Sequence, residues 1–187
     1  MADTRETSEV PLPDHVSLEH GASGLVLIHR WFRPIYIFMA LFCLFWDGFL
    51  IYWYFGIPIQ ATRPAIFYWF PLGHVAVGLG LTYSTIAGFV NRTLIGVSQG
   101  EITIRHTPLP WLGGRRIQAG EIKQLYCEEI RGSESSSTFQ VCAVRNDGNK
   151  LKLLTGLPSS DVALYFEQRI ERQLGIEDRH VPGELSK

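Results

Sequence analysis

The chain has 187 residues, a formal net charge of −1 and a pI near 6.6, and 46% of its residues are hydrophobic. This length allows one modest domain and a smaller addition, and the near-neutral charge argues against nucleic-acid binding, which needs a basic surface. The chain lacks GxSxG, HExxH and glycine-rich phosphate-loop motifs. We therefore expect no enzyme activity, no catalytic residues, no metal and no cofactor.

The segment 1–23 carries five acidic residues, two prolines and no long apolar stretch. It has neither the basic start nor the apolar core of a signal peptide. Low hydrophobicity is typical of a segment that buries little surface. We expect a loosely ordered N-terminal arm, which could still lie along the C-terminal domain.

Two long apolar stretches follow, at residues 34–56 and 65–90. Each is long enough to cross a hydrocarbon core, which needs roughly 20 helical residues. We predict that they form a transmembrane helical hairpin within residues 24–91. Two buried core helices are the alternative, but a chain of this length has too little protein to surround both.

The arginines near the apolar stretches predict an orientation. Arg30 and Arg33 precede the first stretch and Arg92 follows the second, whereas the connecting loop holds only Arg63. Because positive charge collects on the cytoplasmic side, we expect both termini in the cytoplasm and the chain in the inner (cytoplasmic) membrane. A reducing cytoplasm would leave the cysteines as thiols; these are Cys43, Cys127 and Cys142.

Asp47 and His74 are ionisable residues inside the two apolar stretches. Counted from the connecting loop at about 1.5 Å per residue, they share one level of an antiparallel hairpin. An ionisable group in lipid normally faces a partner, so we predict an Asp47–His74 hydrogen bond. A polar contact to another subunit, a proton or ion path, and simple hydration of Asp47 are the alternatives.

The second apolar stretch also carries four small residues spaced by four. A stripe of this kind lets another helix approach closely. Either the first helix of the same chain or a helix of a partner could fill it. The helix-packing residues are Ala76, Gly80, Ser84 and Gly88.

Residues 92–176 change to short alternating segments broken by glycine and proline, a pattern typical of antiparallel β structure. A helix is then predicted from Ser159 or Ser160 to Leu174, with Gly175 ending it and a tail over 177–187. The predicted strands are 93–98, 101–106, 115–118, 122–130, 138–146 and 150–156. The NDGN sequence at 146–149 favours a tight hairpin turn.

Three segments resemble those of a known family; they are RWFRPIYIFMALFCLFWDGFLIYWY, NRTLIGVSQGEITIRHTPLPWLGGRRI and EIKQLYC. The chain resembles bacterial membrane proteins that join two transmembrane helices to a PH-like domain. The resemblance covers most of residues 30–175 and implies a mixed membrane α and β fold. In that fold a helical hairpin precedes a bent antiparallel β domain with a C-terminal helix. It implies no biochemical activity.

The broader PH family often binds lipid headgroups through basic residues in the first hairpin loop, but the corresponding turn here is SQGE. A second basic region remains as a candidate lipid-facing rim. Its residues are Arg105, Trp111, Arg115 and Arg116. Trp111 would either dip into the membrane or plug the mouth of the barrel.

The function that these patterns favour is non-catalytic. We expect an integral membrane interaction or accessory protein, a subunit or assembly component of a larger membrane complex, with lipid and other membrane subunits or a second copy as partners and no nucleic acid. One alternative is a module that senses lipid headgroups. The other is a transport or enzyme component that uses Asp47 and His74.

Overall fold

The computed structural model describes residues 11–13, 16–21, 24–57, 64–132, 137–177 and 184–185. These residues form two compact units. The helical unit contains residues 30–92 together with the loop 107–111, and the β unit contains the rest. Each unit is described by itself.

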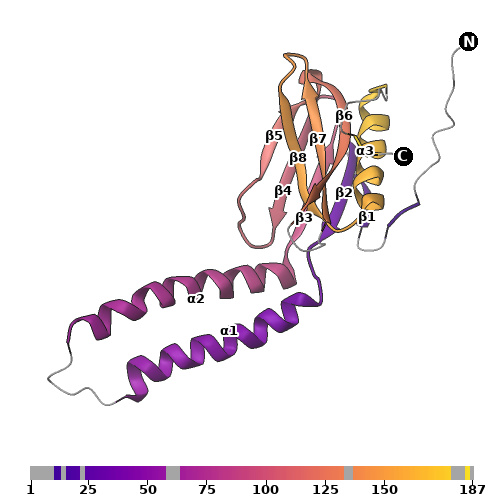
Figure 1. Ribbon diagram of the computed structural model, residues 1–187. Helices are drawn as coiled ribbons and strands as arrows, with labels where there is room; N and C mark the ends of the chain where they lie inside the picture. The colour runs from indigo at the N-terminus through magenta and orange to yellow at the C-terminus, as the bar shows by residue number, and fades with distance from the viewer. Residues whose placement is uncertain are drawn as a thin grey trace, which may run out of the picture. The chain divides into compact units, whose positions relative to one another are not determined.

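The helical unit is an antiparallel hairpin (Figure 1). Helix α1 spans Ile35–Ile51 and continues as a π-helical turn over Tyr52–Gly56, and helix α2 spans Ile66–Val90. Both helices are long and apolar enough to cross a membrane. Their bounds lie within one residue of the predicted stretches, because uninterrupted apolar length is a strong signal. The predicted loop residue Arg63 lies outside the described residues.

The first sheet of the β unit has the strand order β1-β2-β3-β4-β5. Its strands are β1 (Val16–Gly21), β2 (Gly24–Arg30), β3 (Arg92–Val97), β4 (Glu101–Thr107) and β5 (Arg115–Gln118). A 3-10 turn at Ala119–Glu121 leads into the second sheet. The predicted strands 93–98, 101–106 and 115–118 are confirmed to within one residue.

The second sheet has the order β6-β7-β8, with β6 over Ile122–Arg131, β7 over Ser137–Arg145 and β8 over Lys150–Leu157. Helix α3 follows at Ser160–Leu174. Ser159 caps it by accepting a hydrogen bond from the Val162 N–H, and Gly175 ends it with a positive φ of 66°. A glycine adopts that left-handed conformation without steric cost.

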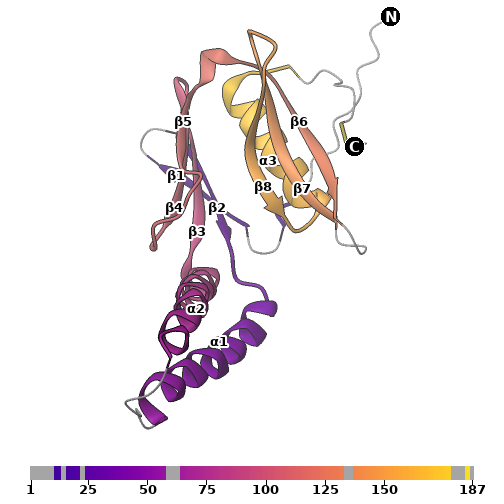
Figure 2. The same cartoon turned by 60° about the vertical axis from the view of Figure 1, so that its left-hand side comes forward.

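The two sheets and α3 share one core (Figure 2). Alternate residues of each strand point inward, as the period of two requires. Leu27 and Ile95 of the first sheet, Leu125 and Val141 of the second, and Phe166 of α3 are all buried in it. The apolar stripe of α3 therefore packs into the core that the sheets enclose.

The segment before the helices differs from the prediction. Residues 1–10 of the expected arm lie outside the described residues, but residues 16–21 form β1 and residues 24–30 form β2. The two strands pair antiparallel in continuous register. Residues 24–30 thus belong to a sheet and not to the helical hairpin, because Leu25 and Leu27 are needed in the β core.

This difference changes the domain organisation. The chain leaves the first sheet at the end of β2 and returns to the neighbouring strand, β3, after both helices. The Trp31 N–H donates to the Asn91 carbonyl at 3.2 Å, so the two ends of the insertion lie side by side. The helical hairpin is therefore an insertion in the β2–β3 connection, and the β unit is discontinuous in sequence.

Candidate functional site

Asp47 lies on the face of α1 that packs against α2. Thr82 Oγ1 of α2 donates a hydrogen bond to Asp47 Oδ2 at 2.7 Å. Asp47 Oδ1 lies over Gly78, where an added Cβ would come within 2.9 Å of it. Because Gly78 has no side chain, it leaves room for the carboxyl group of Asp47. Thr82 supplies the hydrogen-bond donor.

His74 contacts a different residue of α1. Its ring stacks on the ring of Trp46, with centroids 5.8 Å apart. Trp46 Nε1 also donates to the His74 carbonyl oxygen at 3.2 Å, and His74 Nδ1 lies 3.4 Å from the Phe70 carbonyl oxygen of the preceding turn. The His74 ring is therefore in contact with Trp46, the residue that precedes Asp47.

The predicted pairing of Asp47 with His74 does not match these contacts, and the direction of side chains explains why. In an α-helix every Cα–Cβ bond tilts toward the N-terminus of its own helix. The helices are antiparallel, so side chains that start at one level tilt in opposite directions. Asp47 reaches toward the later part of α2, where Thr82 lies, and His74 reaches the other way.

The predicted stripe of small residues is divided between two faces. Gly88 lies against the Tyr36 ring of α1, but Ala76, Gly80 and Ser84 are exposed on a different face of α2. A step of four residues turns about 40° past a full helical turn, so a strict spacing of four drifts around the helix. The face that packs on α1 instead follows a mixture of steps of four and three residues, at His74, Gly78, Thr82, Thr85 and Gly88.

The loop 107–111 is fixed to the base of the hairpin by Asn91. Asn91 is only 2% exposed; its Oδ1 accepts from the Leu109 N–H at 2.8 Å, and its Nδ2 donates to the Leu109 carbonyl at 3.1 Å. The Trp111 ring stacks on Tyr83 and meets Trp31 edge to face. Trp111 therefore packs on the hairpin base within the helical unit, and both of its predicted roles stay predictions.

The three predicted rim arginines are exposed but do not share one face. Arg105 and Arg116 lie on one side of the first sheet, because Arg116 is paired with Thr103 and Arg105 follows Thr103 by two residues. Arg115 is paired with Ile104 and lies on the other side, near His106. Burial and then the Arg115 charge lower the pKa of His106, whose Nδ1 lies 3.0 Å from Thr93 Oγ1.

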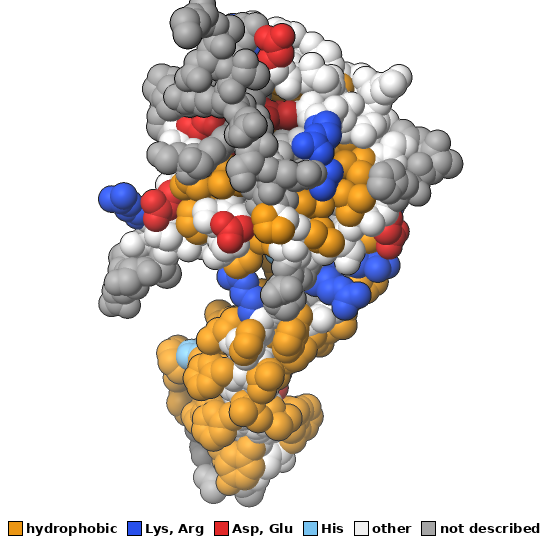
Figure 3. All heavy atoms as spheres, turned by 90° about the vertical axis from the view of Figure 1, so that its right-hand side faces the viewer, with side chains coloured by type: hydrophobic (Ala, Val, Ile, Leu, Met, Phe, Trp, Pro, Cys, Tyr) orange, Lys and Arg blue, Asp and Glu red, His pale blue; other side chains and the backbone are white. Residues whose placement is uncertain are grey.

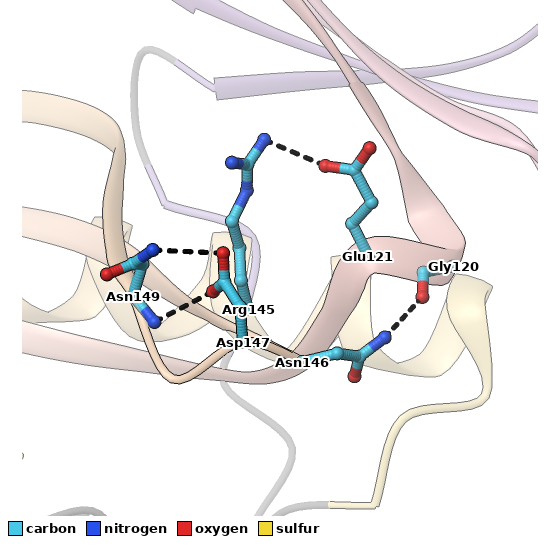
Figure 4. Close-up of polar contacts among 6 residues, drawn as sticks. All are labelled: Gly120, Glu121, Arg145, Asn146, Asp147 and Asn149. Carbon is cyan, nitrogen blue, oxygen red and sulfur yellow. Dashed lines mark hydrogen bonds and ion pairs between the residues drawn. The ribbon is translucent and has the colours of Figure 1, made fainter.

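A second group of polar residues joins the turn between β7 and β8 to the 3-10 turn (Figure 4). Arg145 forms an ion pair with Glu121 at 2.7 Å, and Asn146 Nδ2 donates to the Gly120 carbonyl at 2.7 Å. Asp147 accepts from the backbone and side chain of Asn149, and these hydrogen bonds lower the Asp147 pKa. These contacts hold the turn between β7 and β8 against the 3-10 turn, so we assign the network a structural role.

The face of the second sheet turned away from the core carries a thiol. Gln140 Nε2 donates to Glu128 Oε2, and Cys142 Sγ lies 3.8 Å from the same oxygen. Burial, and then Glu128, raise the pKa of Cys142, and burial likewise raises the pKa of Tyr126. A protonated thiol is a poor nucleophile and metal ligand, so burial makes the Cys142 thiol less reactive.

Sequence reasoning missed one further contact. Leu185, in the predicted tail, donates its N–H to the Cys127 carbonyl of β6 at 2.8 Å and packs against the β core. Full burial of a leucine contributes about 1.5–3 kcal/mol, whereas ordering one residue's backbone costs about 1–2 kcal/mol. Burial of the Leu185 side chain is thus of the size needed to offset the ordering of its backbone.

The described residues contain no group of three or more His, Cys, Asp or Glu side chains placed to hold a metal ion. No family model matches the chain, and no curated protein matches it.

Proposed function

We propose that this chain is a two-pass membrane protein that acts as a non-catalytic interaction or accessory component of a larger membrane complex. The observation that carries the proposal is the surface of the hairpin (Figure 3). Its large apolar side chains point outward; Phe38 is 64% exposed, Leu44 74%, Phe45 76% and Leu79 68%. Exposed apolar surface on this scale is covered by lipid or by another protein.

The exposed small residues of α2 support a protein partner within the membrane. Ala76, Gly80 and Ser84 leave an open strip, and an added Cβ at Gly80 would meet no atom within 4 Å. Small residues let helix backbones approach closely in lipid. The face that α1 leaves open is thus suited to a helix of another subunit or of a second copy.

The proposal includes a location and an architecture. The hairpin would cross the inner membrane of a bacterium with both termini in the cytoplasm, in accord with the arginines at positions 30, 33 and 92. The β unit would be a PH-like domain, since two antiparallel sheets and a C-terminal helix around one core have that layout. Domains of this kind often present surfaces to partners, an inference from fold analogy.

Co-purification tests the partner. The chain is isolated in mild detergent from its native membrane, with Gly80→Leu and Gly48→Leu as matched variants, because both glycines are exposed on a helix and an added Cβ at either meets nothing. We expect a stoichiometric partner that Gly80→Leu loses and Gly48→Leu keeps. A chain that purifies alone as a monomer from every preparation would contradict the proposal.

Cysteine labelling tests the orientation. A reagent that cannot cross membranes should label a cysteine at position 60 in intact cells and fail to label one at position 135. The native cysteines give little background, because Cys43, Cys127 and Cys142 are all buried. The opposite labelling pattern would invert the orientation.

A lipid-sensing function is the second candidate, favoured by the exposed Arg105, Arg115 and Arg116. The β unit without helices 32–90 would be mixed with vesicles of rising anionic lipid content. Because the arginines lie on both faces of the sheet, we expect weak binding that fades with salt. Tight, headgroup-selective binding would favour lipid sensing over partner binding. A transport role for Asp47 and His74 gains no support from their separate contacts.

A further inference from the structure

The loop 107–111 belongs to the helical unit and lies along the last part of α2. Near its middle, the buried Asn91 side chain binds both backbone groups of Leu109. At its end, the Trp111 ring stacks on the Tyr83 ring, with centroids 6.0 Å apart. Tyr83 precedes Asn91 by eight residues, which correspond to about 12 Å along a helix. The loop therefore runs back beside α2, from the end of the helix toward its middle.

The backbone of Leu109 and Pro110 is satisfied within the helical unit. Asn91 accepts from the Leu109 N–H and donates to the Leu109 carbonyl. The Tyr83 hydroxyl donates to the Pro110 carbonyl at 2.5 Å, and a proline has no backbone N–H to satisfy. Irregular backbone is costly at membrane depth, because its polar groups find no water there. These two residues escape that cost through their contacts with α2 and its cap.

The apolar surface of α2 continues past Tyr83 to the end of the helix, since Ile86 and Val90 are both exposed. If the hydrocarbon ended at the level of Tyr83, both side chains would lie in water. Residues 66–83 alone would then cross the membrane, and they span about 27 Å, less than the roughly 30 Å of a hydrocarbon core. The edge of the hydrocarbon is therefore expected near Val90, with Arg92 at the level of the headgroups.

The end of the loop presents apolar side chains. Leu112 is 91% exposed, and Pro108, Pro110 and Trp111 are exposed as well. The Trp111 ring also meets the Trp31 ring edge to face, so two indole rings lie side by side at this end of the hairpin. Tryptophan is enriched at the boundary between membrane and water, because its ring is apolar and its N–H is polar.

We propose that the loop 107–112 is an interfacial anchor, which inserts Trp111 and Leu112 between the headgroups and the acyl chains of the leaflet at this end of the hairpin. Its partner is the lipid bilayer, which it contacts through apolar surface and not through a phosphate site. The inference rests on the membrane-spanning hairpin of the proposed function and deepens it. The anchor would hold the link between β4 and β5 in the membrane surface.

The test uses the full chain in phosphatidylcholine vesicles that contain lipids with a nitroxide quencher at a shallow or a deep acyl carbon. An environment-sensitive fluorophore is attached to a single introduced cysteine, and the native cysteines are buried. Leu112→Cys reports on the loop, Leu44→Cys on an exposed leucine in the middle of α1, and Lys123→Cys on an exposed lysine of β6.

Each label has its own expected pattern. The shallow quencher should reduce the fluorescence at position 112 more than the deep one, and the order should reverse at position 44. Neither quencher should act at position 123. Equal quenching at positions 112 and 123 would overturn the anchor, because the loop would then be no nearer to lipid than the β unit.

Two variants test how the loop is held. Tyr83→Phe removes the hydrogen bond to Pro110 but keeps the ring, and Asn91→Ala removes both hydrogen bonds to Leu109. Each should reduce the quenching at position 112 and leave that at position 44 unchanged; Tyr83→Phe carries the test if Asn91→Ala does not fold. Tyr52→Phe, at an exposed tyrosine near the other end of the hairpin, is the matched control and should change neither. Unchanged quenching at position 112 in the folded variants would contradict the anchored loop.

The outcomes separate this inference from the proposed function. Quenching at position 44 without any at position 112 would overturn the anchor and leave the membrane hairpin intact. Absence of quenching at both positions would remove the membrane hairpin as well. If a co-purified partner shields position 112 from aqueous iodide while no lipid quenches it, the loop contacts protein, and the assignment to lipid is overturned.

Discussion

A carboxyl group between two apolar helices requires a donor, and the hairpin supplies one through Thr82. The contact is short and lies on the packed faces of α1 and α2. Cys43 Sγ and Thr85 Oγ1 form a second polar contact along the same interface, at 3.5 Å. These contacts favour one rotation of each helix about the other, because a turned helix would separate each polar group from its partner.

The first prediction measures the Asp47–Thr82 contact with a double-mutant cycle. Asp47→Leu and Thr82→Val should each lower the thermal stability in detergent, and the double variant should lose less than the sum, since removing both partners costs less than leaving one unpaired. Hydrogen bonds measured this way in membrane proteins average about 0.6 kcal/mol, with a maximum near 1.7.

The matched cycle replaces Thr82→Val with His74→Leu. Because the His74 ring packs on Trp46, its effect should add to that of Asp47→Leu without coupling. A coupling to His74 larger than that to Thr82 would restore the pairing predicted from depth alone. Loss of a transport activity in Asp47→Asn with an intact fold would instead favour the ion-path alternative.

The second prediction concerns pH. Burial lowers the pKa of His106 in the folded state, so the unfolded chain binds the proton more readily. The stabilising contribution of the neutral ring is present above the unfolded pKa of about 6.5 and is lost as pH falls through the lower folded value. The melting temperature of the β unit should therefore fall between pH 7.5 and 5, and His106→Gln should reduce that fall. An identical pH profile in the variant would contradict this role.

At the scale of the elements, the packing of α1 on α2 depends on small residues at specific positions. Gly78 lies under Asp47 and Trp46, whereas Gly80, two residues later, faces away from α1. Glycine in the middle of a helix is otherwise unfavourable. The close approach of the Trp46 and Asp47 side chains gives a physical reason for glycine at position 78, whereas no atom of the described residues lies close enough to require it at position 80.

The third prediction compares the same substitution at both sites. Gly78→Leu should lower the stability of the hairpin by about 1–3 kcal/mol, the usual cost of overpacking, because an added Cβ would already lie 2.9 Å from Asp47 Oδ1 and 3.1 Å from Trp46. Gly80→Leu should leave the thermal stability of the isolated chain unchanged. Equal losses at the two positions, measured by thermal unfolding in detergent, would show that the interface between the helices lies elsewhere.

Some elements could be predicted from the sequence because their signal is local. Apolar length located α1 and α2, and alternation located β3 to β8, because each face of a strand has one environment. The short apolar run LVLI of β2 shows no alternation of its own and lies beside a much longer apolar stretch. The sequence pattern therefore assigns it to the helical hairpin and not to a strand. The partner of Asp47 and the position of Leu185 depend on side-chain direction and on contacts between residues far apart in the chain. The spacing of residues in the sequence does not give this information.

At the scale of the whole molecule, the insertion of the hairpin between β2 and β3 determines which pieces can fold alone. A fragment of residues 93–187 lacks β1 and β2, and with them Val16, Leu25 and Leu27 of the core. Removing so many buried side chains exposes the apolar surface of β3 and of α3, and the remaining strands would have a new open edge.

The last prediction follows from the adjacency of Trp31 and Asn91, whose backbones are joined by a 3.2 Å hydrogen bond. Replacing residues 32–90 with the dipeptide Asn-Gly should connect β2 to β3 by a tight turn, because that dipeptide tolerates the positive φ values of a two-residue hairpin. All eight described strands and α3 would remain, so we expect a soluble protein with a cooperative thermal transition and near-UV circular dichroism. The fragment 93–187 should show neither, since its core is incomplete. If the fragment unfolded as cooperatively as the joined protein, β1 and β2 would be dispensable, and the β domain would begin after the helices, as the alternating pattern alone suggests.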